Sequence, residues 1–81
     1  MPTYFFDIID NGTLAVDQFG DELADDAEAR TQAIALLPTL VRDELPDGDR
    51  HEFATKARNQ SGKVVYETSL IFQGRWWPES D

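Results

Sequence analysis

Cysteine is absent from this 81-residue chain, and histidine occurs once, as His51. Without cysteine there can be no disulfide bridge and no thiolate metal site, which fits a reducing compartment. His51 falls at the start of an expected strand, where we interpret it as an exposed residue rather than a ligand. The sequence contains no phosphate-binding loop, dinucleotide fingerprint or nucleophile elbow. We therefore expect no cofactor and no enzymatic activity.

Long apolar runs are also missing. No segment approaches the roughly 20 apolar residues of a membrane-spanning helix. No basic segment precedes an apolar one at the N-terminus, as it does in a signal peptide. We expect a cytoplasmic protein that does not bind membranes. The length is that of one domain, in which one sheet and one helix can share a core.

Basic residues are scarce. Sixteen aspartate and glutamate residues stand against seven lysine and arginine residues, which gives a formal net charge of -9. Such a charge repels phosphates, so we expect no nucleic-acid binding. Solubility is the simpler interpretation of the charge, although a basic protein partner is compatible with it.

The densest run of aromatic and β-branched residues lies at residues 4–9. Residues of this kind favour strands. The run is followed by Asn11 and Gly12, the strongest signal for a short hairpin turn because both residues tolerate a positive φ. A second strand is therefore expected at residues 14–19.

The register of this first hairpin stays open. A two-residue loop would pair Ile9 with Leu14. A three-residue bulged loop would pair Ile8 with Val16 and would separate apolar from polar residues better.

A helix is expected from Ala27 to about Leu45. Asp25 is its predicted N-cap, and Glu28 lies three residues further on, as in a capping box. Pro38 predicts a kink, a break into two segments or the start of a second short helix, and we favour a curved helix over a hinge. The apolar face of the helix is predicted to consist of Ile34, Leu37, Val41 and Leu45, flanked by Ala27, Ala33 and Leu40.

The second half of the chain predicts another hairpin. A turn at residues 45–48 ends the helix, and strands at residues 50–60 and 63–72 are joined by Ser61 and Gly62. With this two-residue loop the expected cross-strand pairs are Phe53 with Leu70, Thr55 with Thr68, Ala57 with Tyr66, and Lys56 with Glu67.

These elements predict an α+β fold, a two-layer ββαββ domain at residues 1–73, followed by a C-terminal tail at residues 74–81. One long helix, with or without a kink, would cover one face of a four-stranded antiparallel sheet. The other face is more apolar than contact with solvent requires. We take four of its residues and two tail residues as a candidate interface: Phe5, Ile9, Val65, Ile71, Trp76 and Trp77.

Two adjacent tryptophans in a free tail are unfavourable in water because each indole has a large apolar area. We expect at least one of Trp76 and Trp77 to cover the edge of the domain's own core. The alternative is that one of them anchors a second subunit or another partner.

Several acidic residues precede the helix: Asp17, Asp21, Glu22, Asp25 and Asp26. Hard cations bind carboxylates from a compact loop, but this spacing is not that of an EF-hand, so we predict no metal site. Asp7 is expected on the outward face of the first strand. There its charge would discourage association of sheets, or, as the alternative, contact a partner.

The opening at residues 1–6, Met-Pro-Thr-Tyr-Phe-Phe, and the Asp-x-x-Gly-x-Glu-Leu pattern at residues 17–23 are followed by an Ala-rich helix. Together they resemble the domain of unknown function 6894 family of small bacterial proteins, over about residues 1–72. The resemblance implies a similar ββαββ domain and no activity, because none is assigned to the family. Pro38 and the segment at residues 74–78 depart from the family pattern.

Three functions from different classes are compatible with these features. The favoured one is a non-enzymatic interaction module, whose partner is a second copy of itself or an unidentified protein. The second is an acidic regulator that binds a basic protein or imitates nucleic acid. The third is a metal-dependent protein or small enzyme, which only the acidic cluster supports. High salt separates the first two, because an apolar interface persists where charge attraction weakens.

Overall fold

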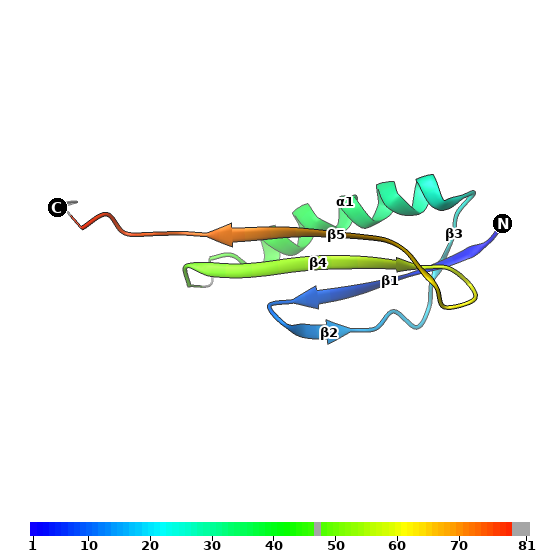
Figure 1. The fold of residues 1–81 in the computed structure, drawn as a ribbon, viewed down its shortest axis with the longest axis horizontal. Coiled ribbons are helices and arrows are strands. Elements are labelled where there is room, and N and C mark those ends of the chain that lie inside the picture. The colour runs from blue at the N-terminus through cyan, green and yellow to red at the C-terminus, as the bar shows by residue number, and fades with distance from the viewer. Residues whose placement is uncertain (47, 79–81) are drawn as a thin grey trace.

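The computed structural model describes residues 1–46 and 48–78 (Figure 1). The elements follow in the order β1 (Thr3–Asp10), β2 (Thr13–Ala15), β3 (Asp21–Glu22), α1 (Asp26–Glu44), β4 (Arg50–Arg58) and β5 (Val64–Gln73). The strands form one antiparallel sheet with the order β2-β1-β4-β5, and the short β3 pairs with β1. The α+β fold is confirmed, with β3 as an unexpected fifth strand.

The helix lies on one face of the sheet, where it contacts β4 and β5 (Figure 1). The buried residues of α1 are Ala29, Ala33 and Leu37. Small residues let a helix approach its neighbour closely. The Thr55 hydroxyl donates a 2.9 Å hydrogen bond to the carbonyl of Ala33. The core beneath the helix is built from Tyr4, Phe6, Phe53 and Ala57 on the strands.

The start of the helix follows the expected capping chemistry. The Asp25 carboxylate accepts a 2.9 Å hydrogen bond from the Glu28 amide, and the Glu28 carboxylate accepts one of 2.6 Å from the Ala24 amide. The helix then continues through Pro38 as one element. Part of the predicted apolar face is wrong. Ala27 is exposed and Ile34 keeps 38% of its surface exposed, because Ala29, which was not predicted, and Ala33, which was, face the sheet.

The first hairpin takes the two-residue loop. Ile9 pairs with Leu14, and Asn11 and Gly12 both have positive φ, of 51° and 93°. This geometry matches the twist of the flanking strands. The expected second strand at residues 14–19 is too long, since β2 ends at Ala15.

The four pairs predicted for the second hairpin are all present. Its turn differs from the two-residue loop expected. A bulge between Ala57 and Arg58 shifts the register, so that the Asn59 amide donates to the Lys63 carbonyl at 2.8 Å. The cause is the Asn59 side chain, which accepts hydrogen bonds from the amides of Ser61 and Lys63. The turn expected at residues 45–48 includes Asp47, which lies outside the described residues.

No helix in the described part of the chain is long and apolar enough to cross a membrane.

Leu37→Ala is expected to lower the free energy of unfolding by about 2–5 kcal/mol, because it removes a buried side chain and leaves a cavity. Ile34→Ala, on the same helix but exposed, is the matched control and should cost less than about 1 kcal/mol. Denaturant titration measures both. A loss below about 0.5 kcal/mol for Leu37→Ala would mean that this side chain does not support the core.

Candidate functional site

The connection between β2 and β3 is held against β1 by the side chain of Asp17. One carboxylate oxygen accepts a 3.0 Å hydrogen bond from the Phe6 amide on β1. The other accepts from the amides of Phe19 and Gly20, at 3.0 and 3.3 Å. The carboxylate thus accepts a hydrogen bond from the middle of β1, where the strand pairs with neither β2 nor β3.

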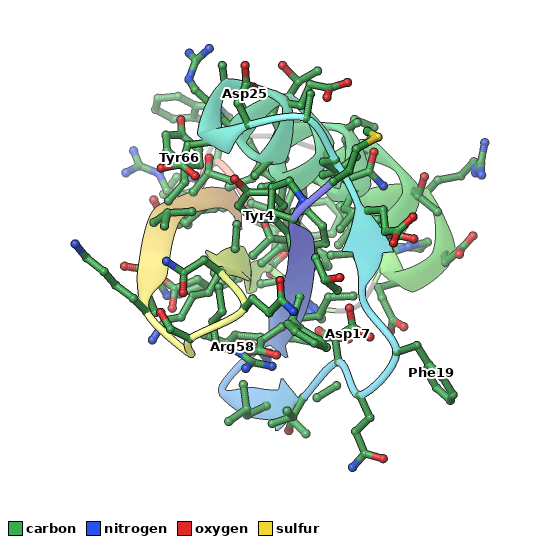
Figure 2. The ribbon with its side chains drawn as sticks, turned by 90° about the vertical axis from the view of Figure 1, so that its right-hand side faces the viewer. Tyr4, Asp17, Phe19, Asp25, Arg58 and Tyr66 are labelled. Atoms are coloured by element: carbon green, nitrogen blue, oxygen red, sulfur yellow. The ribbon has the colours of Figure 1, made fainter. Side chains whose placement is uncertain are left out.

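Asp7 and Arg58 fix the same connection from its other side. Arg58 donates from Nε and Nη2 to the two carboxylate oxygens of Asp7, at 2.7 and 3.0 Å. Nη2 also donates to the carbonyl of Asp17 at 3.1 Å, and the Asp17 amide donates to Asp7 at 2.9 Å. Figure 2 shows Asp17 and Arg58 beside each other. Asp7 alternates with the helix-facing Phe6 along β1 and so lies on the outward face, as expected, but it is buried there and paired with Arg58 rather than exposed.

Both carboxylates are held in their charged form. Hydrogen bonding to Arg58 lowers the pKa of Asp7 below its usual value. Burial alone would raise the pKa of Asp17, but the amides of Phe6, Phe19 and Gly20 outweigh it, so that its pKa is also lowered. This network binds protein groups to one another.

Beside this network lies a groove of about 420 Å³. Its floor comes from β1, one wall from α1 and the other from the β2–β3 connection. The lining is mainly apolar, with polar groups at its margins: Phe6, Ile8, Ala15, Val16, Asp17, Gln18, Phe19, Asp21, Gln32 and Leu36. Phe19 is 92% exposed and points away from the body in Figure 2. Sequence reasoning passed over this residue, although an aromatic among acidic residues was an available signal.

Three of the four sheet residues of the candidate interface, Phe5, Ile9 and Ile71, lie on the open face, because their partners on β4 alternate with the residues that face the helix. Phe5 and Ile9 are half-buried on the open face, and the Arg58 guanidinium lies 5.1 Å from the centre of the Phe5 ring. Val65 was expected beside them but packs against the buried cluster, at the β5 bulge. Ile71 keeps 49% of its surface exposed.

Both tail tryptophans are exposed, by 83% for Trp76 and 65% for Trp77. The Gly74 amide donates to the Asp49 carbonyl at 2.7 Å, and the chain beyond runs away from the body (Figure 1). The expectation that one indole covers the domain's own core is therefore wrong. Instead, the Arg75 guanidinium lies 4.9 Å from the centre of the Trp77 ring.

His51 is buried rather than exposed, contrary to expectation. Its ring stacks on Phe53 with 4.2 Å between centroids, and its Nε2 contacts the carboxylate of Asp10. Among the acids before the helix, Asp26 accepts a 2.6 Å hydrogen bond from the Tyr4 hydroxyl, which raises the pKa of Tyr4 to about 12. Within residues 1–46 and 48–78, no three acidic or histidine side chains are grouped as metal ligands.

Comparison with known families matches residues 3–71 to a domain of unknown function, DUF6894. The match runs from β1 into β5 and stops before the tail. No curated protein and no solved structure matches the chain.

Stability should fall in acid because of Asp7 and Asp17. Folding lowers the pKa of both carboxylates. Such a group stabilises the folded state at any pH above the ordinary aspartate pKa of about 4, and this contribution is lost as the pH falls through the folded-state pKa. Asp17→Asn should cost about 1–3 kcal/mol at pH 7 and flatten the decline between pH 5 and pH 3. Urea titrations across this range test it, with the exposed Asp43→Asn as control. An unchanged pH dependence in Asp17→Asn would contradict the assignment.

Gly20→Ala is expected to be more destabilising than Gly62→Ala. Both glycines have positive φ, which costs an L-residue about 1–2 kcal/mol. A Cβ at Gly62 would meet nothing within 4 Å, whereas one at Gly20 would lie 2.8 Å from Thr3 and 3.0 Å from the Tyr4 carbonyl. We expect about 1–2 kcal/mol for Gly62→Ala and more than about 3 kcal/mol for Gly20→Ala, measured by thermal or urea unfolding. Equal losses would show that the close approach at Gly20 is unimportant.

Proposed function

The chain belongs to the DUF6894 family, and we propose that it is a non-enzymatic interaction module that binds a second copy of itself. One observation carries the proposal. Large apolar side chains stay exposed at the end of β5 and in the tail that continues it. We call these residues the β5–tail surface: Leu70, Ile71, Trp76 and Trp77, exposed by 46%, 49%, 83% and 65%. Leu70 pairs with Phe53 and Ile71 with Glu52, so the two side chains lie on opposite faces of the sheet and the surface spans both sides of β5.

The strand that carries this surface is an edge strand. In the described residues β5 pairs with β4 alone, along ten residues that include one charged side chain, Glu67. Edge strands of monomeric proteins are usually protected by charges, proline or short length. β5 has little of this protection, which supports a partner on that side. Tryptophan is also enriched among residues that dominate binding energy.

The distribution of charge supports a second copy as the partner. In a chain with a net charge of -9, residues 68–78 contain no acidic residue and a single charge, Arg75. Two copies can therefore approach along this stretch without placing carboxylates against each other. The remaining repulsion is screened at physiological ionic strength, where the Debye length is about 8 Å.

The acidic-regulator alternative has weaker support. Several acids near the start of the helix are already engaged by the protein's own groups. Asp17 binds backbone amides, Asp25 caps α1 and Asp26 accepts from Tyr4.

Sedimentation equilibrium tests self-association. The wild-type chain should be dimeric at micromolar concentration and stay so in 1 M salt (about a 3 Å Debye length), because an apolar interface is not screened. The double substitution Leu70→Lys, Ile71→Lys should raise the dissociation constant at least about tenfold, roughly 1.4 kcal/mol. Leu14→Lys is the matched control, since Leu14 is 57% exposed on β2, away from this surface.

A wild-type chain that stays monomeric at several hundred micromolar would overturn homodimerisation. Equal weakening by the Leu14→Lys control would mean that added charge, rather than the β5–tail surface, determines association.

A further inference from the structure

We propose that the groove between α1 and the β2–β3 connection is the acceptor site for Trp76 and Trp77 of a second copy. This inference rests on the proposed self-association and adds to it a second contact, between the tail of one copy and the groove of the other. The groove has the volume of a site for a small organic group, at the lower end of the roughly 300–1,000 Å³ typical of such pockets. It is open because α1 lies over β4 and β5 and leaves the helix side of β1 near Ile8 uncovered.

The tail cannot reach the groove of its own chain. Ile8 in the groove pairs with Thr55, which pairs with Thr68, so the groove lies level with Thr68 on β5. From there to Gln73 is roughly 17 Å along the strand, and β1 is roughly 10 Å across the sheet from β5. The distance to be covered is about 20 Å. Trp76 and Trp77 lie only about 10–14 Å of extended chain beyond Gln73. Indoles that occupy the groove must therefore come from another molecule.

The chemistry of the groove matches that of the tail. Phe6, Ile8, Val16 and Leu36 offer apolar contact to an indole, and Phe19 offers an exposed ring for stacking. The side-chain oxygens of Gln18 and Gln32 are acceptors for the indole N–H.

Charge favours the same pairing. Arg75 precedes the two tryptophans, and Asp21 lies on the groove margin as an exposed carboxylate. The tail therefore carries a cation, Arg75, next to its indoles, and the groove carries an acid, Asp21, next to its apolar lining. Each copy carries both a tail and a groove, so two copies can exchange tails and close a symmetric dimer.

Tryptophan emission tests this contact in the full chain, because Trp76 and Trp77 are its only tryptophans. The emission maximum should move to shorter wavelength as the wild-type concentration rises and the indoles leave water. Val16→Arg, which places a charge in the groove, should abolish this shift and raise the dimer dissociation constant at least tenfold. Leu14→Arg is the control, since Leu14 is exposed on β2 but does not line the groove, and it should behave as wild type.

A peptide experiment makes the test independent of dimer formation. The double substitution Trp76→Ala, Trp77→Ala gives a chain without tryptophan, so that an added synthetic peptide of residues 73–81 supplies all the indole emission. The peptide should bind this chain with a shift to shorter wavelength, and the further substitution Val16→Arg should remove both binding and shift. Circular dichroism of each variant shows that its fold is retained.

The outcomes separate this inference from the proposed function. If Val16→Arg dimerises as wild type and the peptide shows no response, tail docking is wrong. Self-association through the β5–tail surface then stands, provided that Leu70→Lys, Ile71→Lys weakens it. If the wild type is monomeric and the peptide does not bind, both proposals fail.

Discussion

The rest of the structure depends on how the middle of β1 is satisfied, at residues 5–7, where neither β2 nor β3 pairs with it. β2 ends at Ala15 and β3 begins at Asp21, so the Phe6 amide has no strand partner on the edge of β1 that these two strands share. An unsatisfied amide near the core would be destabilising. Asp17 supplies the acceptor, and Arg58 from β4 holds both Asp7 and the Asp17 carbonyl. A contact between residues 51 positions apart thus fixes the outer wall of the groove.

The Asp-x-x-Gly-x-Glu-Leu pattern at residues 17–23 contributes to this construction. Asp17 accepts the amides of the connection, and Gly20 has no space for a Cβ beside Thr3 and Phe5. Glu22 pairs with Thr3 in β3, and Leu23 packs against the buried cluster. Each defined position of Asp-x-x-Gly-x-Glu-Leu therefore has a structural use. The tail lies outside the family match.

Features that depend on a local sequence pattern could be predicted from the sequence. Features that depend on groups distant in the chain could not. The β4–β5 pairs were predicted from a two-residue loop, and they are present because the bulge in β5 offsets a turn that is one residue longer. The cap at Asp25 followed from local hydrogen-bonding chemistry. The side chain of Asn59 changed the turn. Burial of His51 depends on stacking with Phe53 and contact with Asp10, across a pairing of strands distant in sequence. The groove could not be predicted, because it depends on where α1 rests on the sheet.

The position of α1 also explains why the chain exposes apolar surface at two places. One helix cannot cover a sheet of this width, and α1 lies over β4 and β5 with three small or medium side chains buried beneath it. The side of β1 and β2 is left with a groove, while the tail continues β5 beyond the body, and the molecule with its tail is 57 Å long and 21 Å wide. A domain of this size buries a smaller fraction of its surface than a larger domain does and has little stability in reserve. Filling the groove of one copy with the indoles of another would remove both apolar surfaces from water and couple folding stability to self-association.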